Sequence, residues 1–336
     1  MTRVAINGFG RIGRCFLRAA WGDPAIEIVA VNDLGNVENL AYLLRHDSVY
    51  RDFPQEVRTE AGKLIVGGKA IVFLSEKDPA NLPWQSLGID VVVESTGVFD
   101  SYEKASVHLT AGARRVVITA PVKDMAENGA TVLMGVNEEK LRTCTISSNG
   151  SCTTNAGSPL VAILDEGLGI EKALLNTTHA YTATQSVVDG PVRGEDFRRG
   201  RAAAQNMSPS STGAAVSITK AYEKLAGRFD GIAVRVPVIS GSLADITFVA
   251  SRDTTVEEVN AILEKAAGEE RWKGVFTTTR EPLVSSDIIG SPYGSIADLS
   301  MTRVIGNLVK VLAWYDNEMG YTHTLLRHVK EAGRIG

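Results

Sequence analysis

Short apolar runs alternate with amphipathic stretches through the first half of this chain. Runs rich in Val and Ile at residues 4–6, 26–31, 90–94 and 115–119 predict buried strands, and further runs at 131–134 and 144–147 predict two more. Periodic apolar positions at 11–21 and 39–44 predict helices. Continuously apolar strands that alternate with helices indicate a parallel sheet covered on both faces. The first half therefore predicts a Rossmann-type, doubly wound α/β domain.

The pattern changes near residue 150. An apolar helix is expected to begin at Cys152 and to end before Gly167. Later runs at 174–178, 231–237, 242–251 and 308–315 alternate apolar and polar positions, which is typical of antiparallel strands with one covered face. We expect residues 1–150, completed by a C-terminal helix at 317–336, to form one domain. Residues 151–316 are expected to form an α+β domain with a mainly antiparallel sheet.

Residues 181–211 interrupt the second domain with a polar stretch that contains Gly, Pro and a basic cluster at Arg198, Arg199 and Arg201. So long an irregular segment usually has a function or lies at an interface. Arg198 and Arg201 are candidates for an anion site or for ion pairs with carboxylates at a subunit interface, and the sequence leaves both possibilities open.

Composition narrows the possible partners and the compartment. A formal net charge of -4 argues against a nucleic acid or an anionic membrane as the main partner. No apolar stretch approaches the roughly 18 residues of a membrane span, and the N-terminus lacks the pattern of a signal peptide. Three cysteines are too few for a disulfide framework or a zinc site, so we expect no metal and a cytoplasmic protein.

A glycine motif at the start of the chain predicts a dinucleotide site. Gly8, Gly10 and Gly13 have G-x-G-x-x-G spacing directly after the first predicted strand and at the start of the first predicted helix. They allow the tight turn, the approach of a pyrophosphate and close packing of helix on strand. Asp33 ends the second strand, where a carboxylate would bind ribose hydroxyls and repel a 2′-phosphate. The glycine motif predicts a bound dinucleotide rather than a turn without a ligand, and Asp33 predicts NAD rather than NADP.

Cys152 is the best candidate for a nucleophile. It follows a strand and a polar turn and begins an apolar helix, whose N-terminus is expected to lower the pKa of a thiol. Thr153, Thr154 and Asn155 offer donors to an oxyanion on the attacked carbon. Cys15 and Cys144, in a helix face and a strand, are interpreted as small buried hydrophobic residues.

A nucleophilic thiol requires a neighbouring base, and His179 is the best placed of the five histidines. It ends a predicted strand and leads into the polar loop. The other histidines lie beside a charged turn or in helical patterns. Sequence alone leaves His179 open between a base and a structural histidine.

Seven ordered motifs make the chain resemble the phosphorylating glyceraldehyde-3-phosphate dehydrogenase family nearly from end to end. They lie at residues 6–14, 148–155, 179–185, 201–206, 210–215, 234–237 and 314–321. The resemblance implies oxidation of glyceraldehyde 3-phosphate to 1,3-bisphosphoglycerate with NAD and inorganic phosphate, through a hemithioacetal and a thioester. It also implies a homotetramer in which the loop at 181–211 lies near a neighbour's cofactor.

The resemblance implies a role for each matching residue. Cys152 would carry the acyl group and His179 would exchange protons. Thr182 and Arg235 would bind the substrate phosphate, with Arg198 in the same anionic environment. Inorganic phosphate would bind at Ser151, Thr153, Thr212 and Gly213. NAD would contact Gly8, Gly10, Arg11, Ile12, Gly13, Asp33, Thr96, Thr119 and Asn317.

Two other functions compete with this interpretation. Erythrose-4-phosphate dehydrogenase has the same thioester chemistry with hydrolysis, but Thr182 and Thr184 after the histidine favour the glycolytic activity. An NAD-regulated RNA-binding protein is disfavoured as the main function by the net charge and by the intact nucleophile motif. The chain also departs from the family pattern. Gly150, where Ala is common, is expected to loosen the turn before the nucleophile. Ala156, where a second cysteine is common, predicts altered oxidant behaviour.

Overall fold

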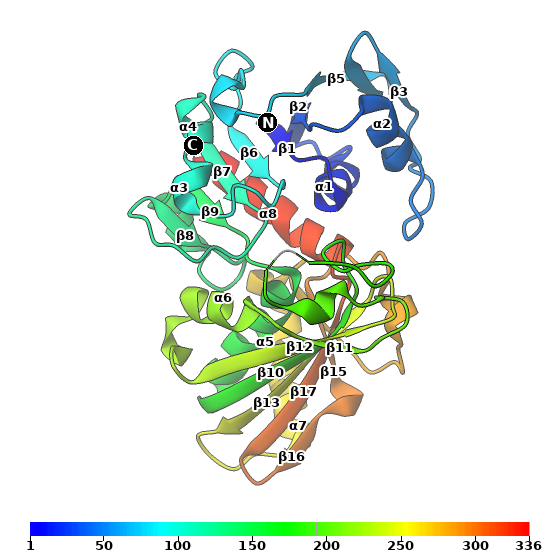
Figure 1. Ribbon diagram of the computed structural model, residues 1–336. Coiled ribbons are helices and arrows are strands. Elements are labelled where there is room, and N and C mark those ends of the chain that lie inside the picture. The colour runs from blue at the N-terminus through cyan, green and yellow to red at the C-terminus, as the bar shows by residue number, and fades with distance from the viewer. Residues whose placement is uncertain (193, 336) are drawn as a thin grey trace. The chain divides into compact units, whose positions relative to one another are not determined.

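The computed structural model describes residues 1–192 and 194–335 (Figure 1). Arg193, within the predicted polar loop, and Gly336, within the predicted terminal helix, lie outside the described residues. The chain divides into two compact units. One contains residues 1–132, 138–150 and 325–336, and the other contains residues 133–137 and 151–324.

The first unit is built on a sheet with the strand order β3-β4-β5-β2-β1-β6-β7-β9-β8. In this order, every neighbouring pair from β5 through β2, β1, β6, β7 and β9 to β8 is parallel. The pairs β3–β4 and β4–β5 are antiparallel and form a meander. The strands are β1 (Thr2–Asn7), β2 (Ile26–Asn32), β3 (Val57–Glu60), β4 (Lys63–Val66), β5 (Lys69–Leu74), β6 (Val91–Glu94), β7 (Arg115–Ile118), β8 (Gly129–Thr131) and β9 (Ile146–Ser148).

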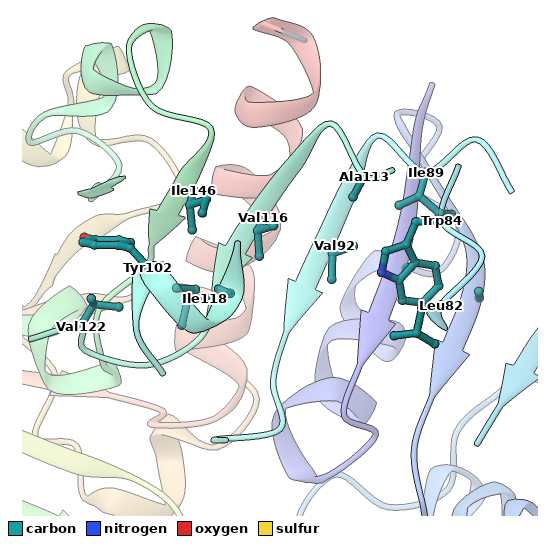
Figure 2. Packing of buried hydrophobic residues seen from close by; sticks show 13 residues of the cluster. Leu82, Trp84, Ile89, Val92, Tyr102, Ala113, Val116, Ile118, Val122 and Ile146 are labelled. Carbon is teal, nitrogen blue, oxygen red and sulfur yellow. The ribbon is translucent and has the colours of Figure 1, made fainter. Parts of the chain in front are cut away.

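Helices and a buried apolar cluster complete this unit. The helices are α1 (Arg11–Ala20), α2 (Val37–Arg45), α3 (Tyr102–Ala105), α4 (Val107–Thr110), the end of α8 (Met319–Ile335), and the short 3-10 segments η1 (Pro79–Asn81) and η2 (Glu138–Arg142). Figure 2 shows Val92, Val116 and Ile146 projecting from neighbouring strands into a cluster that also holds Trp84 and Tyr102. These side chains are at most 4% exposed, so the cluster is a closed core.

The second unit has a mixed sheet with the strand order β11-β12-β10-β13-β17-β15-β14, and β16 pairs with β17. Most pairs are antiparallel, but β10 with β12 and β14 with β15 are parallel. The strands are β10 (Ile170–Ala180), β11 (Ser208–Ser211), β12 (Phe229–Val236), β13 (Ser242–Ala250), β14 (Phe276–Thr279), β15 (Ser295–Asp298), β16 (Arg303–Ile305) and β17 (Leu308–Tyr315).

Helix α5 (Cys152–Leu168) packs against β10, β13, β15 and β17 and is largely buried. The other helical segments of this unit are α6 (Ala214–Ala221), α7 (Val256–Ala267), η3 (Phe197–Gly200), η4 (Glu223–Leu225), η5 (Glu270–Trp272), η6 (Ser285–Ile288) and η7 (Leu299–Met301). None of the helices in the described ranges is long and apolar enough to cross a membrane.

The predicted α/β class, with a parallel sheet and a mainly antiparallel second sheet, is confirmed. Several boundaries were wrong. The run at 144–147 is a strand only from Ile146, so Cys144 lies before it, and the run at 174–178 belongs to a longer strand. The run at 131–134 is a strand only as far as Thr131, and α5 continues through Gly167 to the capping residue Gly169. Glycine in a helix interior costs only about 1 kcal/mol relative to alanine, which the burial of α5 outweighs.

Candidate active site

A cavity of about 480 Å³ lies in the first unit, at the carboxyl ends of β1, β2 and β6. The chain leaves β1 toward β2 on one side and later returns to pair β6 on the other, so the strand order reverses here. Doubly wound sheets bind ligands at such a reversal because the loops diverge there. Gly8, Asp33 and Thr96, which follow these three strands, all line the cavity.

The glycine turn leaves space for a ligand beside helix α1. Gly8 has a φ of +96°, and a Cβ there would lie 2.6 Å from the Ser95 backbone. A Cβ on Gly13 would lie 2.2 Å from the Gly8 carbonyl oxygen, which explains the close packing of helix on turn. A Cβ on Gly10 would meet no described atom within 4 Å. Gly10 is also the N-cap of α1, so phosphate oxygens fit beside the helix N-terminus.

Asp33 holds the turn in place. Its carboxylate accepts hydrogen bonds from the Phe9 backbone N–H at 2.6 Å and from the Gly35 N–H at 2.7 Å. The same carboxylate lines the cavity, where it can meet ribose hydroxyls. Arg11 instead pairs with Asp47 and lies with its guanidinium 5.2 Å from the ring centre of Tyr50.

The structure therefore brings together only part of the predicted cofactor set in the first unit. Gly8, Gly10, Asp33 and Thr96 line the cavity, whereas Arg11, Ile12, Gly13 and Thr119 are not among the described residues of its wall. Asn317 belongs to the second unit. Its Oδ1 accepts hydrogen bonds from Ser242 Oγ at 2.9 Å and Gly241 N–H at 3.2 Å, so its amide nitrogen is the part able to serve a ligand.

Cys152 is the first residue of α5. Ser151 caps this helix, because its hydroxyl accepts the Thr154 N–H at 3.1 Å while the Thr154 hydroxyl accepts the Ser151 N–H at 3.1 Å. Such a capping box fixes the first helical turn. The position of the thiol is therefore set by the helix rather than by a loose loop.

The structure brings the two predicted catalytic residues together. Cys152 Sγ lies 3.2 Å from His179 Nε2. His179 is 2% exposed, near the end of β10, and its ring packs edge-on against Tyr315. The pair has the geometry for proton transfer between thiol and imidazole.

Burial dominates the electrostatics of this pair. It raises the pKa of the Cys152 thiol, and the charge of Arg235 offsets this only in part. Burial, with the charge of Arg235, also lowers the pKa of His179 to about 3. The expected lowering of the thiol pKa is therefore wrong, because loss of water around Sγ outweighs the helix N-terminus. With the proton on Nδ1 directed to the Ala180 carbonyl, the neutral imidazole leaves Nε2 free to accept the thiol proton.

Arg235 reaches the other side of the imidazole. Strands β10 and β12 pair in parallel with His179 opposite Arg235, and Arg235 Nη1 lies 2.6 Å from His179 Nδ1. The Ala180 carbonyl lies 2.6 Å from the same nitrogen and also accepts a hydrogen bond from Arg235 at 3.2 Å. Arg235 Nε is buried and has no partner among the described residues. An anionic ligand would satisfy this donor.

Hydroxyls and a second guanidinium extend this cationic region. Thr182 and Thr184 share a hydroxyl contact of 3.0 Å, and Arg199 donates to Thr184 at 3.2 Å and to Ser210 at 2.9 Å. The charge of Arg199 contributes to the lowered pKa of His179, after burial and Arg235. This arrangement of guanidiniums and hydroxyls suits a phosphate group.

Arg199 is one of the residues that sequence reasoning missed. The structure places Arg198 on the surface, 3.5 Å from Asp196, and pairs Arg201 with Asp189 at 2.9 Å. Both contacts are ion pairs within the loop itself. Arg199 also pairs with Asp196, at 3.2 Å, but it reaches the hydroxyls of Thr184 and Ser210 as well. Adjacent arginines carry the same sequence signal, so only the turn of η3 decides which one meets the hydroxyls.

The residues predicted to bind inorganic phosphate contact different groups of the protein. Thr153 directs its hydroxyl to Tyr315 at 2.9 Å, and that phenol also contacts Thr177 at 2.8 Å in the interior. Thr212 accepts the Ala214 N–H at 3.2 Å, and Gly213 is the N-cap of α6. Tyr315 was another residue without a predicted role, although it lies within the motif at 314–321.

A dinucleotide cavity and a thiol with its own imidazole define a class, the nicotinamide-dependent oxidoreductases that use a covalent intermediate. Models of the glyceraldehyde 3-phosphate dehydrogenase NAD binding domain and C-terminal domain match residues 2–102 and 151–317. The chain therefore belongs to the glyceraldehyde-3-phosphate dehydrogenase family, and NAD is its cofactor.

Relatives of this chain cover almost its whole length. Glyceraldehyde-3-phosphate dehydrogenase 1 of Streptomyces avermitilis is 47% identical over 97% of this chain and 96% of its own length. The chromosomal enzyme of Cupriavidus necator is 49% identical over 96% of both chains. The enzyme of Thermotoga maritima is 48% identical over 97% of both chains. The two family domains matched above span the residues of the cavity and of the cysteine–histidine pair.

Proposed function

We propose that this protein oxidises glyceraldehyde 3-phosphate to 1,3-bisphosphoglycerate, with inorganic phosphate as second substrate, as a cytoplasmic homotetramer. The observation that carries the proposal is the 3.2 Å contact between Cys152 Sγ and His179 Nε2 in the cationic region formed by Arg235 and Arg199. We assign cofactor binding to the first unit and covalent catalysis to the second.

His179 moves the protons of the reaction. The thiol of Cys152 gives its proton to Nε2 as sulfur bonds to the aldehyde carbon, and Nε2 returns that proton to the carbonyl oxygen to form a hemithioacetal. Nε2 then removes the hydroxyl proton while the carbon loses its hydrogen as hydride, which leaves a thioester on Cys152. When bound, NAD supplies the hydride acceptor for this oxidation. Phosphate attack on the thioester carbon releases the acyl phosphate and restores the thiolate, which takes back its proton.

Two anions must be held near Cys152 in this sequence, the phosphate of the substrate and the attacking phosphate. Arg235 and Thr182 are assigned to the substrate phosphate, with Arg199 rather than Arg198 as the second guanidinium. Ser151, Thr153, Thr212 and Gly213 remain proposed for inorganic phosphate. Asn317 is proposed to orient the nicotinamide amide.

The decisive assay measures NADH formation from glyceraldehyde 3-phosphate with and without inorganic phosphate, and from erythrose 4-phosphate under both conditions. We expect phosphate-dependent turnover with the triose phosphate. Cys152→Ser and Cys152→Ala should abolish thioester formation while NAD still binds. Phosphate-independent turnover preferring erythrose 4-phosphate, or normal turnover of either variant, would contradict the proposal.

A further inference from the structure

A chain of buried hydrogen bonds in the first unit ends at the wall of the cofactor cavity. Trp84 and His108 are 0% exposed and Glu94 is 2% exposed. Trp84, visible in Figure 2 among the core side chains, precedes β6, Glu94 ends that strand, and His108 lies in α4. A carboxylate buried so completely needs several donors to replace water.

The neighbouring groups fix the tautomer of His108. Trp84 Nε1, which can only donate, lies 3.1 Å from His108 Nδ1. Nδ1 must therefore accept, and the imidazole proton is on Nε2. That Nε2 lies 3.0 Å from Glu94 Oε2 and donates to it. His108 thus accepts a hydrogen bond from the indole of Trp84 and donates one to the carboxylate of Glu94.

The carboxylate of Glu94 in turn holds two residues of the cavity wall. Asn7 Nδ2 donates to Oε2 at 2.6 Å. The backbone N–H and the hydroxyl of Thr96 donate to Oε1 at 2.8 Å and 2.5 Å. Asn7 and Thr96 both line the cavity, and so does Phe99, whose ring packs edge-on against His108. Three wall residues therefore depend on groups that do not themselves line the cavity.

We infer that Glu94 and His108 are positioning residues for NAD, because they hold Asn7, Thr96 and Phe99 in the shape that the cofactor binds. The inference rests on the proposed function only in taking this cavity as the NAD site. Neither side chain needs to touch the cofactor. Their effect is on cofactor affinity, through groups whose conformations they fix.

The test measures the dissociation constant of NAD by titration calorimetry on the full chain, with no substrate present. Glu94→Gln is the sharpest variant. If the new amide keeps its oxygen toward Thr96, its NH₂ group faces the N–H donors of Asn7 and His108, and those hydrogen bonds are lost. We expect the dissociation constant of NAD to increase at least about tenfold, as for the loss of a hydrogen bond to a charged group.

A pair of His108 variants separates positioning from general stability. Gln at position 108 can keep the N–H donor toward Glu94 but not the acceptor for Trp84, whereas His108→Leu removes both. NAD affinity should fall less in His108→Gln, which keeps the donor to Glu94 and loses only the ring against Phe99 and the acceptor for Trp84, than in His108→Leu. Val116→Ala, at a fully buried core position that does not line the cavity, is the matched control for lost packing.

Melting temperatures of all variants are measured alongside. The inference is overturned if Glu94→Gln and His108→Leu bind NAD as tightly as the unchanged protein, or if affinity follows melting temperature and Val116→Ala loses as much. If Glu94→Gln does not fold, the two His108 variants decide. Absence of NAD binding in the unchanged protein would instead reject the cofactor site and the proposed function with it.

Discussion

At the scale of single residues, Gly150 shows how one backbone conformation leads into the nucleophile. It has a φ of +61°, and its N–H donates to Ser148 Oγ at 3.0 Å. Side chains disfavour this left-handed region by roughly 1–2 kcal/mol, so glycine suits the turn better than the alanine common in the family. The residue that looked like a loosening of the turn fits the conformation that the turn adopts.

We therefore expect Gly150→Ala to lower the free energy of unfolding by about 1 kcal/mol. Gly268→Ala is the control, because Gly268 caps α7 with a φ of -86° that alanine adopts without strain. Chemical denaturation of both variants measures the effect. Equal stability of the two variants would show that the turn rearranges at no cost.

A buried histidine makes the stability of the fold depend on pH. His328 is 0% exposed, and its ring contacts Ser147 Oγ at 2.8 Å and Asn149 Oδ1 at 3.0 Å. Burial lowers the pKa of His328 to about 3 from an ordinary 6.5. Below pH 6.5 the unfolded chain binds a proton that the folded chain does not, so stability is lost as the pH falls toward 3.

Replacing His328 should make the free energy of unfolding less sensitive to acid pH. As the pH falls from about 6 to 4, the free energy of unfolding should decrease more steeply in the unchanged protein than in His328→Gln. The two slopes should differ by up to about 1.4 kcal/mol per pH unit. Urea titrations at several pH values measure both slopes, and contributions of other groups cancel in the difference. Parallel slopes would mean that His328 is protonated alike in both states.

At the scale of elements, strand pairing assembles the site. The register of β10 on β12 sets His179 beside Arg235, and the register of β11 on β12 sets Ser208 on the far side of Arg235. Helix α5 supplies the thiol from its first residue. The base, the guanidinium and the nucleophile thus occupy regular elements, which hold catalytic groups more rigidly than loops do.

Because the charge of Arg235 lowers the pKa of Cys152, its removal should raise that pKa further. We expect the rate of Cys152 alkylation by iodoacetamide, followed against pH, to shift to higher pH in Arg235→Leu. Arg198→Leu, which removes an exposed arginine from the neighbouring loop, should leave the profile in place. A shift of equal size in both variants would point to net charge rather than to Arg235.

The sequence predicted the elements whose periodicity is strong, and failed where the signal is local and polar. The buried strands β1, β6 and β7 and the start of α5 were evident from apolar runs and the turn before Cys152. The meander β3–β5 was missed because its short strands carry charged residues such as Arg58 and Lys63. The link from Trp84 to Glu94 had no linear signature, because its members meet only in the folded sheet.

At the scale of the whole molecule, the proposed homotetramer is the main open prediction. Light scattering coupled to size-exclusion chromatography should give a mass of four times the 36.0 kDa chain. A protein that elutes as a monomer and still turns over would reject the tetramer while leaving the chemistry intact. A dimer would reject the stated assembly but allow the loop at 181–211 to meet one neighbour.

The return of the chain to its first unit affects how the protein can be made. Residues 325–335 of α8 belong to the unit that begins at residue 1, where Lys330 binds Asp23 at 2.8 Å and the Gly333 backbone lies against Thr2. A ribosome therefore translates all of the second unit before the closing segment of the first exists. Until residues 325–335 are made, the first unit lacks the segment that contacts Thr2 and Asp23, so it cannot close before the second unit has been synthesised.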